Sequence, residues 1–215
     1  MAELRPVALP PAQRTVGQLV AESVRFYGDH FWEALGLGIA PAALAAVTPN
    51  VSRHTASILS PSVFGALLSA TFVAACVLAL EARPSRGQLL RAWLVGWAVV
   101  EPVLVPVPYV VFAGVVWLIC LALVVPVLVV ERLPVSASVG RAVRLFRADW
   151  VHQFGSILTL AVVVVLSQGT LALALRGFGG TAVWISFFLA SMVVSPLLFI
   201  GTALLYVDQK ARAKG

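Results

Sequence analysis

Charged residues are scarce in this sequence. Only 11% of its 215 residues are Asp, Glu, Lys or Arg, whereas 60% are hydrophobic. Soluble domains carry roughly 25% charged residues, and a soluble fold of this length has too little interior to hide so much apolar surface. The composition therefore predicts a protein that is surrounded by lipid.

Cysteine is rare as well, and recognisable catalytic motifs are missing. Cys76 and Cys120 both fall inside apolar runs, which predicts buried thiols rather than a disulfide or a metal pair. Neither a catalytic triad nor paired catalytic carboxylates, a phosphate loop or an HExxH motif can be identified. We therefore expect no enzyme, no cofactor and no metal. His30, His54 and His152 are expected to be solvated, with a metal site shared by His30 and His152 as the alternative.

The sequence also lacks a dense basic cluster and an apolar leader. Its net charge of +6 is spread thinly and is not interleaved with aromatic residues, which argues against a nucleic-acid partner. The first 30 residues have no apolar core, so no secretory signal peptide is expected. Residues 1–14, with three prolines, are predicted to be an irregular cytoplasmic tail.

Long apolar runs are what the sequence does contain. A membrane-spanning helix needs about 20 mostly apolar residues. Six stretches qualify, which are 32–48, 61–80, 88–105, 109–130, 152–174 and 181–206. The third and fourth are joined by a turn at Pro106 and Pro108; one long broken helix is the alternative to a hairpin. The predicted fold class is all-α, a polytopic membrane helix bundle forming a single domain over residues 15–215.

The distribution of lysine and arginine between the two sides of the membrane is a test of this topology. Six crossings leave thirteen of these residues on the side of both termini and only Arg53 and Arg176 on the other side. Cytoplasmic loops of membrane proteins are enriched in Lys and Arg. We therefore expect a multi-pass protein of a bacterial plasma membrane with both termini in the cytoplasm.

One stretch between the crossings, residues 135–149, reads as an amphipathic helix. Its apolar positions fall on one side, and its basic positions fall on the other. The apolar residues are Val135, Val139, Val143, Phe146 and Trp150, and the basic residues are Arg141, Arg144 and Arg147. Such a helix is predicted to lie flat in the cytoplasmic interface, with its arginines directed to anionic lipid headgroups.

A second stretch, residues 15–29, matches the first when it is shifted by 119 residues. Arg25 then corresponds to Arg144, and Thr15 with Gln18 forms a capping-box start. Phe31, Trp32 and Trp150 follow the two helices and are expected at the same interface. The match predicts a parallel internal repeat, a surface helix plus two crossings, with the hairpin 88–130 inserted between the copies. The alternative is chance similarity of two valine-rich helices.

Three segments resemble the bacterial glycerophosphoryl diester phosphodiesterase membrane-domain family: TVGQLVAESVRFYGDHFW, PVLVVERLPVSASVGRAVRLFRADW and LLYVDQKARAKG. Pro126 and Glu131 close the fourth crossing, and Tyr206, Asp208, Lys210, Arg212 and Gly215 form the terminal pattern. Gln209 departs from that pattern, where an aliphatic residue is usual. The resemblance implies a multi-pass membrane protein with a poorly defined role. No phosphodiesterase domain follows Gly215, so that activity is not expected.

Glu101 is the candidate functional residue within a crossing, because ionisable groups in membranes are costly and often functional. We expect it to face the bundle interior and to handle protons or cations; the alternative is a structural carboxylate at the outer interface, paired with Arg176. Pro41, Pro126 and Pro196 are predicted helix kinks, with a substrate site at these breaks as the alternative.

The absence of a catalytic constellation favours a non-catalytic membrane scaffold, anchor or assembly module with an unidentified protein partner. The alternative is a small transporter or lipid-handling protein that uses Glu101 and the kinked helices.

Overall fold

The chain is helical throughout the part that the computed structural model describes, residues 10–104, 108–175 and 180–213. Within these residues there is no strand. The α-helices are α1 Val16–Asp29, α2 Phe31–Leu37, α3 Ile39–Val47, α4 Arg53–Leu59, α5 Gly65–Ala79, α6 Arg86–Leu104, α7 Pro108–Leu121, α8 Val124–Glu131, α9 Val135–Ala148, α10 Trp150–Leu175, α11 Gly180–Val194 and α12 Pro196–Arg212. Three short turns, η1 Pro11–Gln13, η2 Thr48–Asn50 and η3 Ser60–Phe64, complete the described elements.

Four helical segments in the described part are long and apolar enough to cross a membrane. They are Arg53–Ala79, Ala113–Glu131, Trp150–Leu175 and Trp184–Arg212. A fifth exists if α1 and α2–α3 are counted together, but this pair is bent by 108°. The membrane-protein prediction thus agrees with the helix lengths, whereas six crossings exceed what length and composition alone support.

Prolines divide several of these segments. Pro41 follows the break at Gly38, Pro126 follows the break at Ala122–Leu123, and Pro196 follows the break at Ser195. Proline has no N–H and its ring clashes with the carbonyl of residue i−4, so the helix is disrupted just before it. The structure therefore has the predicted breaks, each one to four residues before a proline.

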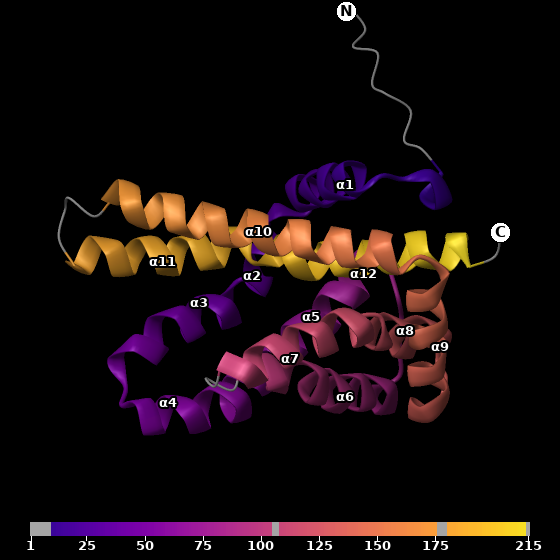
Figure 1. The fold of residues 1–215 in the computed structure, drawn as a ribbon, viewed down its shortest axis with the longest axis horizontal. Helices are drawn as coiled ribbons and strands as arrows, with labels where there is room; N and C mark the ends of the chain where they lie inside the picture. The colour runs from indigo at the N-terminus through magenta and orange to yellow at the C-terminus, as the bar shows by residue number, and fades with distance from the viewer. Residues whose placement is uncertain (1–9, 105–107, 176–179, 214–215) are drawn as a thin grey trace, which may run out of the picture.

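The long helices lie roughly along one direction, and α9 crosses their end (Figure 1). The helices α10, α11 and α12 run together, with α1 packed on α10 and α12. Gly38, between α2 and α3, lies against the backbone of Met192 in α11, where a Cβ atom has no room. Small residues here permit close helix packing, as in many membrane proteins.

The segments predicted as the third and fourth crossings contain α6 and α7, and these two helices pack against each other. Gly114 of α7 lies against the backbone of Pro102 in α6. The connecting residues 105–107 lie outside the described residues. The main core lies between α5, α7, α8, α9 and α12 and includes Leu123, Leu145 and Leu205, all with no exposed surface.

The N-terminal segment differs from its prediction as an irregular tail. Pro11–Gln13 forms the turn η1, which packs along α12. Thr15 then caps α1, and its hydroxyl and the Gln18 side chain form the predicted capping box. Residues 1–9 lie outside the described residues. The tail prediction is therefore wrong for residues 10–14, because contacts with α12 order them.

Candidate functional site

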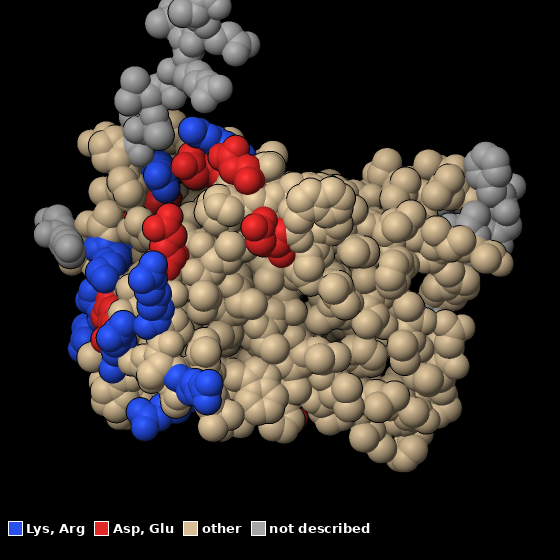
Figure 2. Space-filling model, turned by 180° about the vertical axis from the view of Figure 1, so that it is seen from behind, with Lys and Arg blue, Asp and Glu red and all other residues tan. Residues whose placement is uncertain are grey.

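Charged side chains gather at one end of the molecule. Figure 2 shows Lys, Arg, Asp and Glu concentrated at the end that holds α9 and the last turns of α12, while most of the same face is uncharged. Several of these side chains are buried and bonded to one another across distant parts of the sequence. They are called the terminal network below, and its residues are Arg14, Glu131, Arg141, Asp149, His152, Tyr206, Asp208, Gln209, Lys210 and Arg212.

The first part of the terminal network surrounds Glu131, the last residue of α8. Tyr206 donates its hydroxyl proton to Glu131 Oε1 at 2.9 Å, and Arg141 Nε lies 3.2 Å from Oε2. Lys210 Nζ lies 3.4 Å from Oε1 and donates to the Tyr206 oxygen at 3.0 Å. Tyr206 and Lys210 are four residues apart on α12 and so share a face. One carboxylate therefore joins α8, α9 and α12.

The second part surrounds Asp208, which has no exposed surface. Arg14 Nη1 lies 3.2 Å from Oδ1, and His152 Nε2 lies 3.8 Å from Oδ2. Asp208 belongs to α12, His152 to the first turn of α10, and Arg14 to the segment before α1. A buried carboxylate without compensating cations is very costly. The pairing explains why this acid is tolerated inside the bundle.

The third part surrounds Asp149, between α9 and α10. Its Oδ1 accepts a bond from the His152 backbone N–H at 2.9 Å, and its Oδ2 lies 2.7 Å from Arg212 Nη1. Gln209 donates its amide to the Asp149 carbonyl at 2.8 Å. Arg212 also donates to the Arg14 carbonyl at 2.6 Å. These bonds connect the chain before α1, the α9–α10 junction and the end of α12.

The terminal network is bonded mainly to itself, and four of its buried polar atoms in the described molecule make no hydrogen bond: His152 Nε2, Asp208 Oδ2, Gln209 Oε1 and Arg212 Nε. None of the residues lining three hollows of the described molecule belongs to it. Over the described ranges there is also no group of three His, Cys, Asp or Glu residues arranged to hold a metal ion. Its carboxylates are taken up by internal cations, so the chemistry that it offers is cohesion between segments.

His152 was expected to be solvated, and the structure corrects this expectation. Its side chain is 7% exposed and its Nε2 atom faces Asp208. Asp149, Asp208 and Arg14 also acquire their roles only through this packing. In the sequence, only the positions of these three residues point to such a role: each lies at the end of an apolar run or beside the start of a helix.

The predicted surface arginines fall into two groups. Arg144 and Arg147 of α9 are exposed, as is Arg25 of α1, whose Nε lies 4.0 Å from Asp29. Arg141 is different, because it turns inward to Glu131 and only 24% of its side chain is exposed. The prediction that Arg141 faces away from the protein with the other two arginines is therefore wrong.

The buried side of α9 also differs from the predicted valine stripe. Ser138, Ala142 and Leu145 are fully buried, whereas Val135 is 39% exposed. Val139 and Phe146 are partly buried against the core. The predicted valine stripe is therefore not the face of α9 that packs on the bundle. The neighbouring face with Ser138 and Ala142 packs instead, because these small residues let α9 approach the bundle closely.

The three predicted interfacial aromatic residues all present exposed rings. The exposed fractions are 40% for Phe31, 78% for Trp32 and 57% for Trp150. Phe31 and Trp32 also contact each other edge to face, with ring centroids 5.1 Å apart. Large exposed aromatic residues at helix ends are typical of the membrane–water interface.

Glu101 does not face the bundle interior, so that prediction is wrong. It is exposed near the end of α6 and is absent from the walls of the hollows. None of the ion pairs between described residues involves it. Arg176, its predicted alternative partner, lies outside the described residues. Pro102, directly after Glu101, is inside α6.

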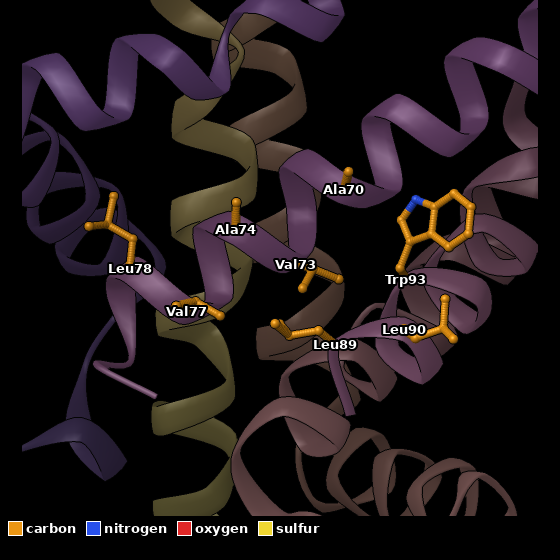
Figure 3. Close-up of a pocket in the computed structure, with 8 residues that line it drawn as sticks. All are labelled: Ala70, Val73, Ala74, Val77, Leu78, Leu89, Leu90 and Trp93. Atoms are coloured by element: carbon orange, nitrogen blue, oxygen red, sulfur yellow. The ribbon is translucent and has the colours of Figure 1, made fainter. Parts of the chain in front are cut away.

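The hollows are mostly apolar, except for one that is lined in part by Gln168, Ser191 and Ser195. One of about 300 Å³ lies between α5, α6, α7, α10 and α12, and its only polar lining residue is Thr202. Another of about 300 Å³ contains Gln168, which donates to Ser191 at 3.1 Å. The third is a shallow groove of about 630 Å³ between α5 and α6 (Figure 3). Pro196 and Pro126 line none of them.

Comparison with known proteins adds no relative: no family model, no curated protein and no solved structure matches this chain.

Proposed function

We propose that this chain is a six-pass plasma-membrane protein with both termini in the cytoplasm, and that it acts as a non-catalytic scaffold, anchoring or assembly module. The observation that carries the proposal is the terminal network. Each of its carboxylates is paired with an internal cation, two of the three hollows are apolar, and Glu101 lines none of them. A site for chemistry needs accessible convergent groups, and the charged end instead consolidates the fold.

Two of the six proposed crossings, α6 and the pair α2–α3, are not among the four segments that are long and apolar enough to span a membrane by themselves. The helix α6 has 19 residues, and α2 with α3 covers Phe31–Val47. At 1.5 Å per residue α6 is about 28 Å long, close to the roughly 30 Å of a bilayer core. Of its three charged residues, Arg86 and Arg91 lie toward one end and Glu101 toward the other, within reach of headgroups. The broken pair α2–α3 is the shorter crossing.

In this proposal α1 and α9 are the two interfacial helices of a parallel repeat. The shift of 119 residues superposes two of the three buried positions of each helix, since Leu19 corresponds to Ser138 and Ser23 to Ala142, and all four are fully buried. Arg25 and Arg144 are both exposed. Matching buried positions on both helices favour a common origin over chance similarity. The resemblance to the glycerophosphoryl diester phosphodiesterase membrane-domain family belongs to the same proposal.

The partners in this proposal are anionic lipid headgroups and a protein that docks on the exposed basic surface. Arg144 and Arg147 project from α9, and each arginine near an anionic surface contributes about 1 kcal/mol of attraction. No nucleic acid is involved. A transporter role has less support, because Glu101 is exposed on the outside of the bundle.

The topology is tested by labelling single cysteines with a membrane-impermeant maleimide. In a chain with Cys76 and Cys120 replaced by alanine, Ala148→Cys probes the charged end and Ser57→Cys probes the α4 end; Ala148 and Ser57 are exposed or half-exposed. Intact cells should label the Ser57→Cys chain, and inverted vesicles the Ala148→Cys chain. The opposite pattern, or a C-terminal reporter active outside the cell, would contradict the proposed orientation.

The scaffold role is tested by crosslinking in native membranes followed by mass spectrometry. A docked protein should crosslink to α9, and the double variant Arg144→Gln/Arg147→Gln should lose it while keeping its abundance. Glu101→Gln is the control, since it removes a charge far from α9. Loss of a transport phenotype in Glu101→Gln with the crosslink intact would favour the transporter instead.

A further inference from the structure

The helices α5 and α6 hold each other tightly along only half of their length. Trp93 donates its indole N–H to the Ala66 carbonyl and Trp97 donates to the Pro61 carbonyl, both at 2.8 Å. Ser69 donates to the Trp93 carbonyl, and Gly96 leaves room for the Ser69 hydroxyl. These bonds join η3 and the first five residues of α5 to the middle of α6. The other half has no such bond among the described residues.

A groove opens where the bonds stop. Its wall on α5 is formed by Val73, Val77 and Leu78, and its wall on α6 by Leu89, Leu90 and Trp93. Ala70 and Ala74 of α5 also line the hollow and are exposed, and Figure 3 shows their small side chains on the other side of α5 from Val73 and Val77, which lie nearer to Leu89. The volume is about 630 Å³ and the lining is almost entirely carbon.

The open end of the groove meets positive charge. Arg86 is exposed and lies three residues before Leu89 and four before Leu90, so it continues the groove-facing side of α6. Arg83 is exposed in the α5–α6 link, and Arg132 is held there by a bond from its Nη2 to the Arg83 carbonyl at 3.0 Å. The positive charge of these three arginines is greater than the negative charge of Glu81, which is the one exposed carboxylate in the α5–α6 link.

The dimensions suit a phospholipid. Ala70 to Leu78 covers nine residues of α5, and the eight steps between them span about 12 Å at 1.5 Å per residue. One leaflet of a bilayer core is about 15 Å deep, half of the roughly 30 Å of the whole. An apolar groove of one leaflet's depth with arginines at one end therefore reproduces the division of a lipid into acyl chain and charged headgroup.

We propose that this groove binds one anionic phospholipid, with an acyl chain over Ala70 and Ala74 and the phosphate between Arg86 and Arg132. The inference rests on the proposed membrane location but not on the scaffold role or on the number of crossings. A partner helix fits less well, because the end of the groove presents cations, and anionic lipid is abundant on the cytoplasmic leaflet.

The experiment uses the purified full-length chain in nanodiscs that contain equal amounts of phosphatidylglycerol and phosphatidylcholine. A trace of phosphatidylglycerol with a photoreactive diazirine on its acyl chain is added, and the labelled peptides are identified by mass spectrometry. A parallel sample carries the same diazirine on phosphatidylcholine. We expect label on residues 70–78 and 89–93 from phosphatidylglycerol and only diffuse surface label from phosphatidylcholine.

Two variants separate groove filling from a general effect on the fold. Ala74→Phe fills the groove and should abolish its label. Ala98→Phe places the same bulk on an exposed position of α6 outside the groove and should leave the label unchanged. Arg86→Gln should weaken phosphatidylglycerol retention about fivefold, the equivalent of about 1 kcal/mol for one arginine near anionic lipid.

Equal labelling from both lipids, or equal loss in Ala74→Phe and Ala98→Phe, would overturn the proposal. Native mass spectrometry of the same samples adds a further decisive outcome: a dimer that disappears in Ala74→Phe alone would assign the groove to a second copy of the chain and overturn the lipid. The readout requires no partner protein and no topology reporter, so its failure is distinguishable from failure of the proposed function.

Discussion

Asp208 and Glu101 are both carboxylates within apolar helices, and their surroundings are opposite. Asp208 is fully buried, with Arg14 at 3.2 Å and His152 at 3.8 Å. Glu101 is exposed on the outside of the bundle. The comparison shows that an acid inside an apolar run does not by itself indicate a buried functional group. The packing of distant segments decides which acid is enclosed.

The difference has a physical cause at each end of the molecule. The charged end supplies cations from the chain before α1, from α9 and from α12, so a buried acid gains partners there. Glu101 lies near the end of α6, and the neighbouring residues Val100, Val103 and Leu104 line an apolar hollow. A lone carboxylate gains nothing from burial among apolar side chains, and solvent or headgroups are the better surroundings.

The largest expected effect comes from Asp208→Asn. Removing one partner of a buried ion pair leaves the other without compensation, which costs about 3–5 kcal/mol. For a protein of this size that corresponds to a fall in melting temperature of about 6–20 °C. Tryptophan fluorescence during heating of the chain in detergent measures it.

A matched control is Asp149→Asn, which removes one charge from the more exposed pair with Arg212. Its fall in melting temperature should be smaller than that of Asp208→Asn. Equal falls, or an unchanged melting temperature in Asp208→Asn, would contradict the view that the buried acid holds the charged end together.

Glu131→Gln comes next. The variant weakens the acceptor for Tyr206, Arg141 and Lys210 while keeping the side-chain shape. Hydrogen bonds to charged groups contribute about 1.5–3 kcal/mol, and this carboxylate is partly exposed, so we expect the lower part of that range. Limited proteolysis should show earlier cleavage at the α8–α9 junction than in the wild type. If the α8–α9 junction resisted proteolysis as well as in the wild type, Glu131 would not be needed to hold these helices together.

The arginines of α9 give a smaller effect that depends on lipid. Arg141→Gln should lower the melting temperature in phosphatidylglycerol and phosphatidylcholine nanodiscs alike, because it breaks an internal pair with Glu131. Arg144→Gln/Arg147→Gln should lower it only in phosphatidylglycerol, where each arginine contributes about 1 kcal/mol. A lipid-independent fall in the double variant would place those arginines in protein contacts instead.

Glu101→Gln should have the smallest effect. Exposed substitutions away from specific contacts usually change stability by less than about 0.5 kcal/mol. The melting temperature should therefore match the wild type within about 2 °C, and Glu101→Ala should behave in the same way. A large fall in either variant would mean that Glu101 is enclosed in the membrane-embedded protein.

Local signals in the sequence predicted local structure well. Thr15 and Gln18 predicted the start of α1, and the capping box is present. Pro41, Pro126 and Pro196 predicted helix breaks, which lie just before each proline. These features depend only on residues within one helical turn, so the chain nearby is sufficient to predict them.

Contacts between distant segments were not predictable in the same way. Arg141 and Arg144 are both arginines on one helix, and only Arg141 reaches Glu131. Gln209 is a polar residue between Asp208 and Lys210 near the end of α12, and the structure gives it a bond to the Asp149 carbonyl and no exposed surface. The sequence contains no signal for these pairings, because they depend on how α9, α10 and α12 pack.

By itself the sequence determined that this chain is helical with several helices long and apolar enough to cross a membrane, because apolar composition and run length decide which solvent a helix tolerates. It also determined where charge is concentrated and where the helices break. Only the tertiary structure decided which charged side chains are enclosed, that Glu101 is not among them, and that α5 and α6 separate into a groove. Those outcomes depend on segments far apart in the chain meeting at close range, where burial makes an unpaired charge costly and a paired one tolerable.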